Sequence, residues 1–470
     1  MYTTVIIGIL LSVIGVISIF LVTRHWKWMP LVLLVILWYI PRQTVPGGVL
    51  DDFIILRWLS IFLIPLIVIV QLLRMAIRAQ PVNLTNIILP LGIYILFCIF
   101  SGIINSVSFI ELFGNIVLYI RYPLLFIVLV NMNTEKKVVR TFIHLFVFLL
   151  VLQIPECLFR FFKYGIYGDY ISWSLGPWGH FDLGVYAVYG AALTVATAAI
   201  KQVKWYHLIF VTLLVTVALL GEIKALAFSI PIISMVTIYA SFRQKKKRKY
   251  FLAIALPVFF VILVLISYHY WERVHQFSGN TLALYFNKLS NFVHDPSVLV
   301  NPEKVDVSSS RFLGSAYVWN YLKNDWRMLF FGTGPGSLLA GNFLGTPGKI
   351  LEEVPFLNQI AVMLGDTGVI GLILYFWILI NLAKVILKVN KIVRDESVRV
   401  IATAVVGMWL FYTLLGPFYE LMWRHDSPNF IFYFFTAFLY SYMRKQNKES
   451  SRAVGYNKVG YNKNEGSADK

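Results

Sequence analysis

The sequence predicts an all-α polytopic membrane protein with about thirteen transmembrane helices and one long extracytoplasmic loop that contains an amphipathic helix. Three observations carry this prediction. Hydrophobic residues make up 59% of the 470 residues and charged residues only 14%, which leaves too little polar surface to cover a soluble protein of this size. Apolar runs long enough to cross a bilayer as helices recur along the chain. Basic residues gather in every second connection between these runs.

The apolar runs divide the chain into four regions. We expect an N-terminal transmembrane region (1–268), a long extracytoplasmic loop (269–355), a C-terminal transmembrane region (356–443) and a polar cytoplasmic tail (444–470) that is disordered. The first run lacks a basic leader and a cleavage site, so we expect a retained anchor. The predicted spans are 3–22, 28–41, 53–73, 86–104, 110–130, 138–159, 182–200, 205–221, 223–241, 250–268, 356–383, 398–416 and 428–443.

The positions of the charges predict the orientation. A net charge of +18 would suggest nucleic acid as the partner of a soluble protein, but here the basic residues lie in alternate loops beside apolar spans. Placing those loops inside predicts a multi-pass protein of the cytoplasmic (inner) membrane with its N-terminus outside and its C-terminus inside. If the short span 28–41, bounded by Pro30 and Pro41, does not cross, both ends lie inside. Membrane lipids are then a partner, and nucleic acid is not.

The same topology concentrates long loops on the outer face, where we expect the function. The chain shows no internal repeat of the kind that builds many transporters. Cys98 and Cys157 fall within predicted spans and are expected to be buried thiols. No cluster of His, Asp and Glu has metal-ligand spacing, with Asp51 and Asp52 a weak exception, so we expect neither a metal nor another cofactor.

One segment of the long loop, Ser308 to Ser337, has its own organisation. Apolar side chains recur at helical spacing, which predicts an amphipathic helix on the membrane surface after serine N-cap candidates. A glycine-rich stretch ends it. The three glycines resemble a nucleotide-binding loop only superficially, because no strand precedes them, and a tight turn that returns the chain to the bilayer is the better interpretation. The apolar positions are Phe312, Ala316, Trp319, Leu322 and Trp326, and the glycines are Gly332, Gly334 and Gly336.

These residues, in this order, resemble a family signature. An arginine, a tryptophan, a G-x-G-x-G turn, an asparagine and an E-x-G-x-x-G span entry are similar to the O-antigen polymerase and O-antigen ligase superfamily, membrane glycosyltransferases of the C type. The chain has Asp366 where that family has glutamate. Leu357 stands where the ligase branch has a histidine, which favours the polymerase branch. The matching residues are Arg311, Trp319, Gly332, Gly334, Gly336, Asn358, Asp366, Gly368 and Gly371.

Two upstream segments resemble the family more weakly. The stretch Gly176 to Gly190 is similar to the entry of a middle span, and "GEIKALAFSIPI" has Lys224 where the family often has arginine. The resemblance implies transfer of a glycan from a polyprenyl (undecaprenyl) diphosphate carrier, so fixed positive charge must meet the departing diphosphate. Arg311, Lys224 and Arg160 are the candidates on the outer face, where guanidinium groups bind two oxygens at once.

The acceptor hydroxyl needs a base or a positioning group. Glu353 is the first candidate and Glu352 the second, because "EEVPFLN" places a carboxylate at the mouth of a span; a solvated loop end is the alternative for this pair. His180 can also serve, although a structural role is the more common one for a single external histidine. Asn358 belongs to the predicted substrate-binding set.

Three further residues complete the predicted substrate-binding set. Arg121 falls near the middle of the span 110–130, where an unpaired charge is costly, so it is expected to contact the diphosphate or brace the cavity. A structural ion pair with Glu111 or Glu156 is the alternative. Trp319 can stack on a sugar or anchor the chain at the interface. Arg424, with His425 and Asp426, lies in the last outer loop and faces either lipid headgroups or sugar.

The resemblance therefore implies a polymerase that joins lipid-linked oligosaccharide repeats into a surface polysaccharide or exopolysaccharide, without a metal. The growing chain leaves its carrier and is transferred to a new lipid-linked unit, with flippase and chain-length regulator proteins as further partners. Two alternatives remain open. One is a ligase that passes finished glycan to another acceptor, and the other is a non-enzymatic flippase or exporter of the same lipid-linked sugars.

Overall fold

A computed structural model describes most of the helical bundle. The described residues are 24–43, 54–77, 85–132, 134–165, 171–176, 179–221, 224–241, 310–338, 357–419, 421–422 and 425–464. The predicted spans 3–22 and 250–268 lie outside them. So does most of the predicted extracytoplasmic loop.

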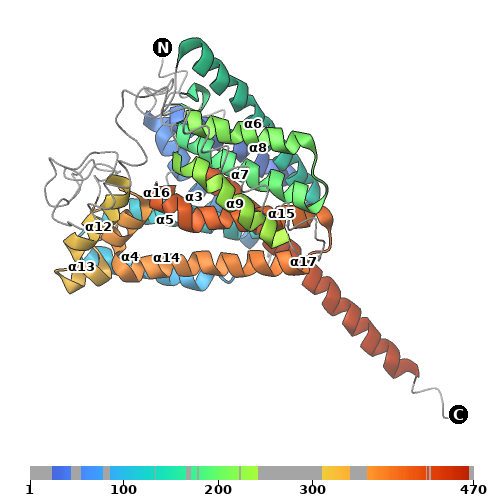
Figure 1. The fold of residues 1–470 in the computed structure, drawn as a ribbon. Helices are drawn as coiled ribbons and strands as arrows, with labels where there is room; N and C mark the ends of the chain where they lie inside the picture. Colours follow the sequence, from blue (N-terminus) through green and yellow to red (C-terminus); the bar gives the residue numbers. More distant parts are fainter. Residues whose placement is uncertain are drawn as a thin grey trace.

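Within the described residues the secondary structure is helical and contains no strand, which confirms the all-α prediction there (Figure 1). The elements are η1 Arg24–Trp28, α2 Met29–Gln43, α3 Ile54–Ile77, α4 Ile88–Ile104, α5 Phe109–Asn131, α6 Lys136–Tyr164, η3 Trp173–Leu175, α7 His180–Ile200, α8 Trp205–Leu220, α9 Lys224–Ser241, α12 Ser310–Leu322, α13 Trp326–Phe331, α14 Gln359–Ile392, α15 Glu396–Leu410, η7 Phe411–Leu415, α16 Gly416–Tyr419 and α17 Asp426–Asn464.

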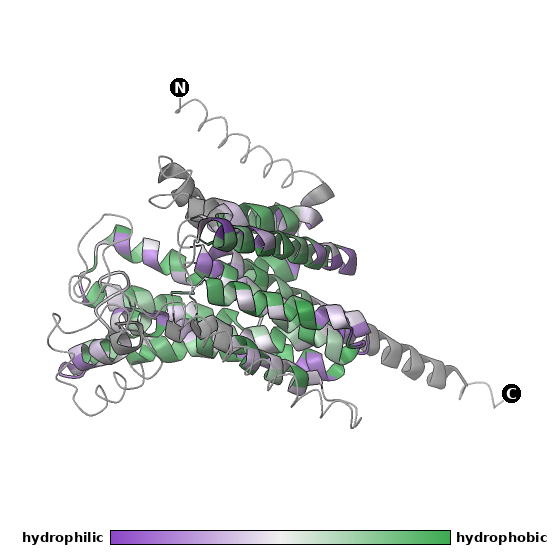
Figure 2. Cartoon of the chain, turned by 45° about the horizontal axis from the view of Figure 1, so that its top comes forward, coloured by the Kyte–Doolittle hydropathy of each residue, from purple (hydrophilic) through white to green (hydrophobic). Residues whose placement is uncertain are grey.

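Several helices have the length and composition to cross a membrane. Among the described residues, 5 helices meet both conditions, and shorter apolar helices accompany them. Figure 2 shows hydrophobic residues along most of the bundle and hydrophilic residues mainly toward the helix ends. Large apolar side chains also face outward, such as Ile103 at 68% and Phe162 at 79% exposure. Such an apolar exterior is what a bilayer covers. The larger number of predicted spans stays a prediction. The 5 helices are Phe109–Asn131, Lys136–Tyr164, His180–Ile200, Gln359–Ile392 and Glu396–Leu415.

Helix α7 occupies the centre of the bundle, packed against α8, α9 and α15. Nearly every residue from Phe181 to Ala196 is buried. Small residues allow this close packing: a Cβ added at Gly190 would lie 2.5 Å from Leu150. Aromatic contacts fix neighbouring helices, as where Tyr186 stacks on Trp38 with ring centroids 3.8 Å apart. The buried thiols of Cys98 and Cys157 confirm the prediction for these two residues.

Several of the predicted cytoplasmic loops contact one another at one end of the bundle. We call this end the Lys136 end. Lys27 pairs with Glu135, and Lys136 Nζ lies 2.6 Å from Asp395 Oδ2. The hydrogen bond from Lys136 lowers the pKa of Asp395. Arg399 donates to the carbonyl of Ser241 over 3.0 Å. These loops were all assigned to one side by their basic residues, and their contacts agree with that grouping. Which side faces the cytoplasm stays a prediction.

Two helices are longer than the sequence predicted. Helix α14 continues to Ile392 instead of ending near residue 383. Helix α17 continues to Asn464 and projects from the bundle, although we expected disorder from about residue 444 (Figure 1). Extending an existing helix costs much less than starting one, so polar residues that follow a packed span can remain helical.

Candidate functional site

The glycine turn lies at the end of the bundle opposite Lys136, which we call the glycine-turn end. Glu352, Glu353 and Arg424 lie outside the described residues. Arg311 is the second residue of α12, and Lys224 is the first residue of α9. The structure describes only the backbone of these two residues. The predicted roles of Lys224, Arg311 and Glu353 therefore stay predictions.

The glycine turn follows α13 and has the conformation that its glycines predict. Gly332, Gly334 and Gly336 have φ angles of 73°, 96° and 86°, a region that side chains with a Cβ rarely adopt. The backbone N–H groups of Thr333 and Gly334 donate to the carbonyls of Gly365 and Asp366 over 2.7 and 2.9 Å. The interpretation of this stretch as a tight turn is confirmed, and its docking partner is α14.

The carboxylate of Asp366 fills the centre of this turn. Its oxygens accept hydrogen bonds from the N–H groups of Gly336 at 2.9 Å and Leu338 at 3.1 Å, and from the hydroxyl of Tyr119. Successive backbone N–H groups in a turn form an anion-binding concavity. Here the protein's own carboxylate occupies it. Asp366 is thus the anchor of the glycine turn.

Gly368 marks a break within α14. It has φ 65°, outside the helical region, and interrupts the helix. A Cβ there would lie 2.5 Å from the carbonyl of Phe330, and one at Gly332 would lie 2.4 Å from the carbonyl of Asp366. The two backbones touch because both positions are glycine.

Helices α4 and α5 hold the other side of the turn. Ser101 donates to the carbonyl of Phe331 over 2.6 Å, and the Asn105 amide donates to the carbonyl of Gly332 over 3.2 Å. Phe331 stacks on Phe97 with ring centroids 6.0 Å apart. The turn is therefore clamped between α14 and the α4–α5 pair. We call the turn, Asp366 and these contacts the glycine-turn cluster.

Helix α12 lies against α14 and α16 and confirms a helix in this part of the predicted loop. Val318 and Leu322 are buried against the bundle, while Trp319 is 46% exposed. Ser315 donates to the side-chain oxygen of Asn358 over 3.1 Å. The same oxygen accepts from the N–H of Ala361 and caps α14. Asn358, predicted to bind substrate, thus joins α12 to α14.

Two other predicted residues, Arg160 and His180, lie on α6 and α7. Arg160 Nε lies 3.2 Å from Glu156 one turn earlier on α6, and Glu156 also accepts from the N–H of Ser174 at 2.9 Å. This arrangement ties the end of α6 to η3. His180 is half-buried at the first position of α7. Both residues lie at the glycine-turn end of their helices.

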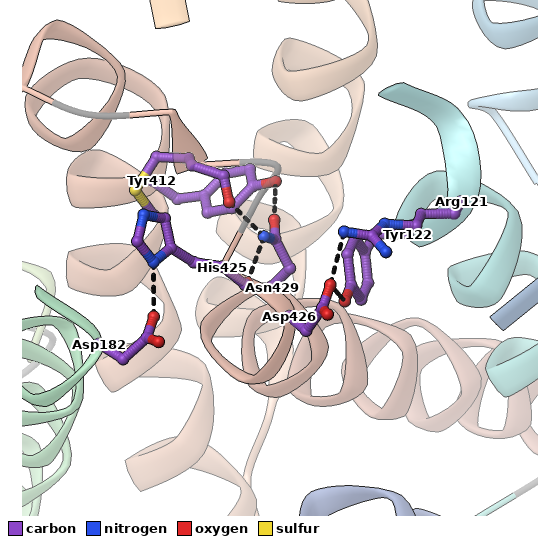
Figure 3. A network of polar contacts seen from close by, with 8 residues as sticks. Arg121, Tyr122, Asp182, Tyr412, His425, Asp426 and Asn429 are labelled. Carbon is purple, nitrogen blue, oxygen red and sulfur yellow. Dashed lines mark hydrogen bonds and ion pairs between the residues drawn. The ribbon is translucent and has the colours of Figure 1, made fainter. Parts of the chain in front are cut away.

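Arg121 forms a buried ion pair with Asp426, a residue that we expected to face lipid headgroups or sugar. Its Nη2 lies 2.5 Å from Asp426 Oδ1, and both side chains are almost fully buried. Tyr122 donates to the same oxygen over 2.6 Å, and its ring lies 5.0 Å from the guanidinium carbon (Figure 3). The predicted partners were Glu111 and Glu156. Asp426 reaches Arg121 instead because the first turn of α17 enters the bundle beside α5.

The residue before Asp426 makes a second buried polar contact. His425 Nδ1 lies 2.6 Å from Asp182 Oδ1, and the imidazole packs on Phe181 with ring centroids 4.2 Å apart (Figure 3). Asn429 donates to the carbonyl of His425 over 2.6 Å and accepts from Tyr412. We call the residues Arg121, Tyr122, Asp182, Tyr412, His425, Asp426 and Asn429 the Arg121 cluster.

Tyr412 brings an unusual backbone to this cluster. It lies in η7, a π-helical turn that continues α15. Such turns are rare and occur often at functional sites. The sequence analysis did not identify Tyr122, Asp182, Tyr412 or Asn429. The available signal was the intramembrane charge of Arg121, which required a buried acidic partner and so pointed to every acidic residue near a span.

Within the described residues, no group of three or more His, Cys, Asp or Glu side chains is placed to hold a metal ion. Comparisons with models of known protein families and with curated proteins found no match.

Proposed function

We propose that the protein is a membrane glycosyltransferase that transfers glycan from a polyprenyl diphosphate to a lipid-linked oligosaccharide acceptor, and so polymerises a surface polysaccharide. The observation that carries the proposal is the Arg121 cluster. It holds a fixed guanidinium and a carboxylate-bound imidazole on adjacent elements in an apolar helical bundle. These are the two kinds of group that departure of a diphosphate and attack by a hydroxyl require.

The guanidinium of Arg121 supplies the charge for the leaving group. A planar guanidinium binds two oxygens of a diphosphate at once, and in a site that excludes water this attraction is stronger than at a surface. Asp426 and Tyr122 hold the group in one orientation. Arg311 on α12 and Lys224 on α9 are expected to add positive charge, because both helices begin at the glycine-turn end.

The reaction follows from these roles. A hydroxyl oxygen on the acceptor sugar attacks the anomeric carbon of the donor, and the bond from that carbon to the diphosphate oxygen breaks with its electron pair leaving on the diphosphate. The hydroxyl proton passes to a base. Attack opposite to the leaving group inverts the anomeric carbon. Glu353, with Glu352 second, remains the predicted base in the part of the chain outside the described residues.

Substrate must reach Arg121 from the glycine-turn end. Arg121 and His425 are both buried, and His425 directly follows the short connection between α16 and α17. The lipid carrier remains beside the apolar exterior of the bundle, which suits a polyprenyl chain.

The experiment uses cells that depend on this protein for a polysaccharide. Arg311→Ala and Glu353→Gln change two residues of the predicted site, and Lys323→Ala, an exposed change after α12, is the matched control. All variants are first shown to reach normal membrane levels. Lipid-linked glycans are then separated on a gel, and their side of the membrane is determined by digestion with an added glycosidase.

We expect the two site variants to lose long polymer and to accumulate single lipid-linked repeats outside the cytoplasm, with the control unchanged. Repeats trapped on the cytoplasmic side would instead identify a flippase. Long polymer that forms but stays on its lipid carrier would identify a ligase. If both site variants show the same distribution of glycan lengths on the gel as the wild type, Arg311 and Glu353 do not belong to the site.

A further inference from the structure

His425 and Asp426 are consecutive residues that face different helices. His425 contacts Asp182 on α7, and Asp426 contacts Arg121 on α5 (Figure 3). The imidazole of His425 and the guanidinium of Arg121, which is bound to Asp426, therefore lie on either side of the backbone at the start of α17. The exposed fractions of His425 and Asp182 are 3% and 4%, so both groups lie inside the protein.

The contact with Asp182 fixes which nitrogen of His425 is basic. An ionised carboxylate only accepts hydrogen bonds, so the nitrogen that faces it, Nδ1, carries the proton. The lone pair of the neutral ring is then on Nε2. A carboxylate at Nδ1 also stabilises the imidazolium that forms when Nε2 takes a proton. Phe181 against the ring and Asn429 at the His425 carbonyl hold this orientation.

We propose that His425 is the general base of the transfer reaction and that Asp182 is its positioning residue. This inference rests on the proposed function and replaces Glu353 as the proton acceptor, so that Glu353 keeps only the other role considered for it, the positioning of the acceptor hydroxyl. The acceptor hydroxyl gives its proton to Nε2 while its oxygen forms the new bond to the anomeric carbon and the diphosphate leaves with the electron pair of the broken bond. The imidazolium then returns the proton to the departed diphosphate or to water.

A pair of substitutions separates a base from a structural histidine. In His425→Asn the side-chain amide nitrogen takes the place of Nδ1 and keeps the hydrogen bond to Asp182, but no group replaces Nε2. In His425→Gln the amide nitrogen takes the place of Nε2, and the bond to Asp182 is lost. His144→Asn, at an exposed position on α6, is the matched control. The full-length protein is reconstituted in liposomes with lipid-linked repeats extracted from membranes of the producing cells.

We expect His425→Asn to lower kcat by about 100-fold or more, the usual contribution of a general base, while KM for the acceptor stays within about threefold. His425→Gln loses activity to the same degree, and His144→Asn keeps it. Asp182→Asn keeps an oxygen that accepts from Nδ1 but loses the charge, and it lowers kcat by about 10-fold or more. It provides the same test if His425→Asn is not recovered as a monodisperse protein in detergent.

The outcomes separate the two proposals. If the wild-type protein polymerises the repeats and either His425→Asn or Asp182→Asn, recovered intact, retains wild-type kcat, His425 is a structural residue and the base lies elsewhere. If the wild-type protein transfers no glycan between the repeats, the transferase itself is overturned, and the base with it. Loss of kcat in both variants with an active wild type supports the assignment.

Discussion

Tyr119 and Tyr122 lie one turn apart on the same face of α5, and each donates a hydrogen bond to a buried aspartate. Tyr119 binds Asp366, the anchor of the glycine turn. Tyr122 binds Asp426, the partner of Arg121. One turn of α5 therefore connects the glycine-turn cluster to the Arg121 cluster, and a shift of α5 that changes one must change the other.

The ion pair between Arg121 and Asp426 predicts a large loss of stability when one partner is removed. Arg121→Ala leaves a buried carboxylate without its cation, which costs about 3–5 kcal/mol. Lys136→Ala breaks the exposed pair with Asp395, and exposed pairs contribute less than about 1 kcal/mol. The midpoints of thermal unfolding in detergent are compared. Equal unfolding midpoints for the two variants would show that loss of Arg121 costs no more stability than loss of an exposed ion pair.

The contact between the glycine turn and α14 predicts a position-specific effect of alanine. Gly368→Ala forces a Cβ into positive φ and against the carbonyl of Phe330, so we expect a loss of at least about 2 kcal/mol. Gly92→Ala in α4 meets no atom within 4 Å and should stabilise the helix by about 0.5–1 kcal/mol. Thermal unfolding checks both. A neutral Gly368→Ala would mean that α14 is continuous there.

The hydrogen bond from Tyr119 to Asp366 predicts energetic coupling between α5 and α14. Tyr119→Phe, Asp366→Asn and the double variant form a cycle in which residues in contact show coupling of about 0.5–3 kcal/mol. We expect the double variant to lose less stability than the sum of the single variants. If the losses of stability in the single variants add up to the loss in the double variant, Tyr119 and Asp366 are not energetically coupled. The amide N–H of Gly336 would then be the main partner of the carboxylate.

The two ends of the bundle predict opposite reactivity for introduced cysteines. Asn324 near α13 and Ser397 on α15 are both exposed, and they lie at opposite ends. The native thiols of Cys98 and Cys157 are buried and should give little background. With a membrane-impermeant maleimide, we expect Asn324→Cys to react in intact cells and Ser397→Cys only after permeabilisation. The reverse pattern would invert the predicted orientation.

Much of the fold could be predicted from hydrophobicity and charge alone. Apolar runs gave the positions of helices such as α5 and α7 to within a few residues, because membrane helices follow composition closely. Helix ends were less predictable. The continuation of α17 to Asn464 depends on propagation from a packed span, which hydropathy does not measure.

The candidate site was predictable only in part. The cost of an intramembrane charge identified Arg121, but the choice of Asp426 as its partner depends on how α17 packs beside α5, and no local pattern encodes that. The glycines predicted a turn. The role of Asp366 as the anchor of this turn could not be predicted, because the turn and α14 are distant in the sequence and meet only in the folded protein.

The chain is fastened at Leu338 and again at Asn358, on either side of residues 339–356. The N–H of Leu338 binds Asp366, and Asn358 binds Ser315 while it caps α14. Because each border is held by contacts of its own, lengthening the segment between them adds only a small entropic cost. Segments of different length can therefore be exchanged at this position while the bundle stays intact.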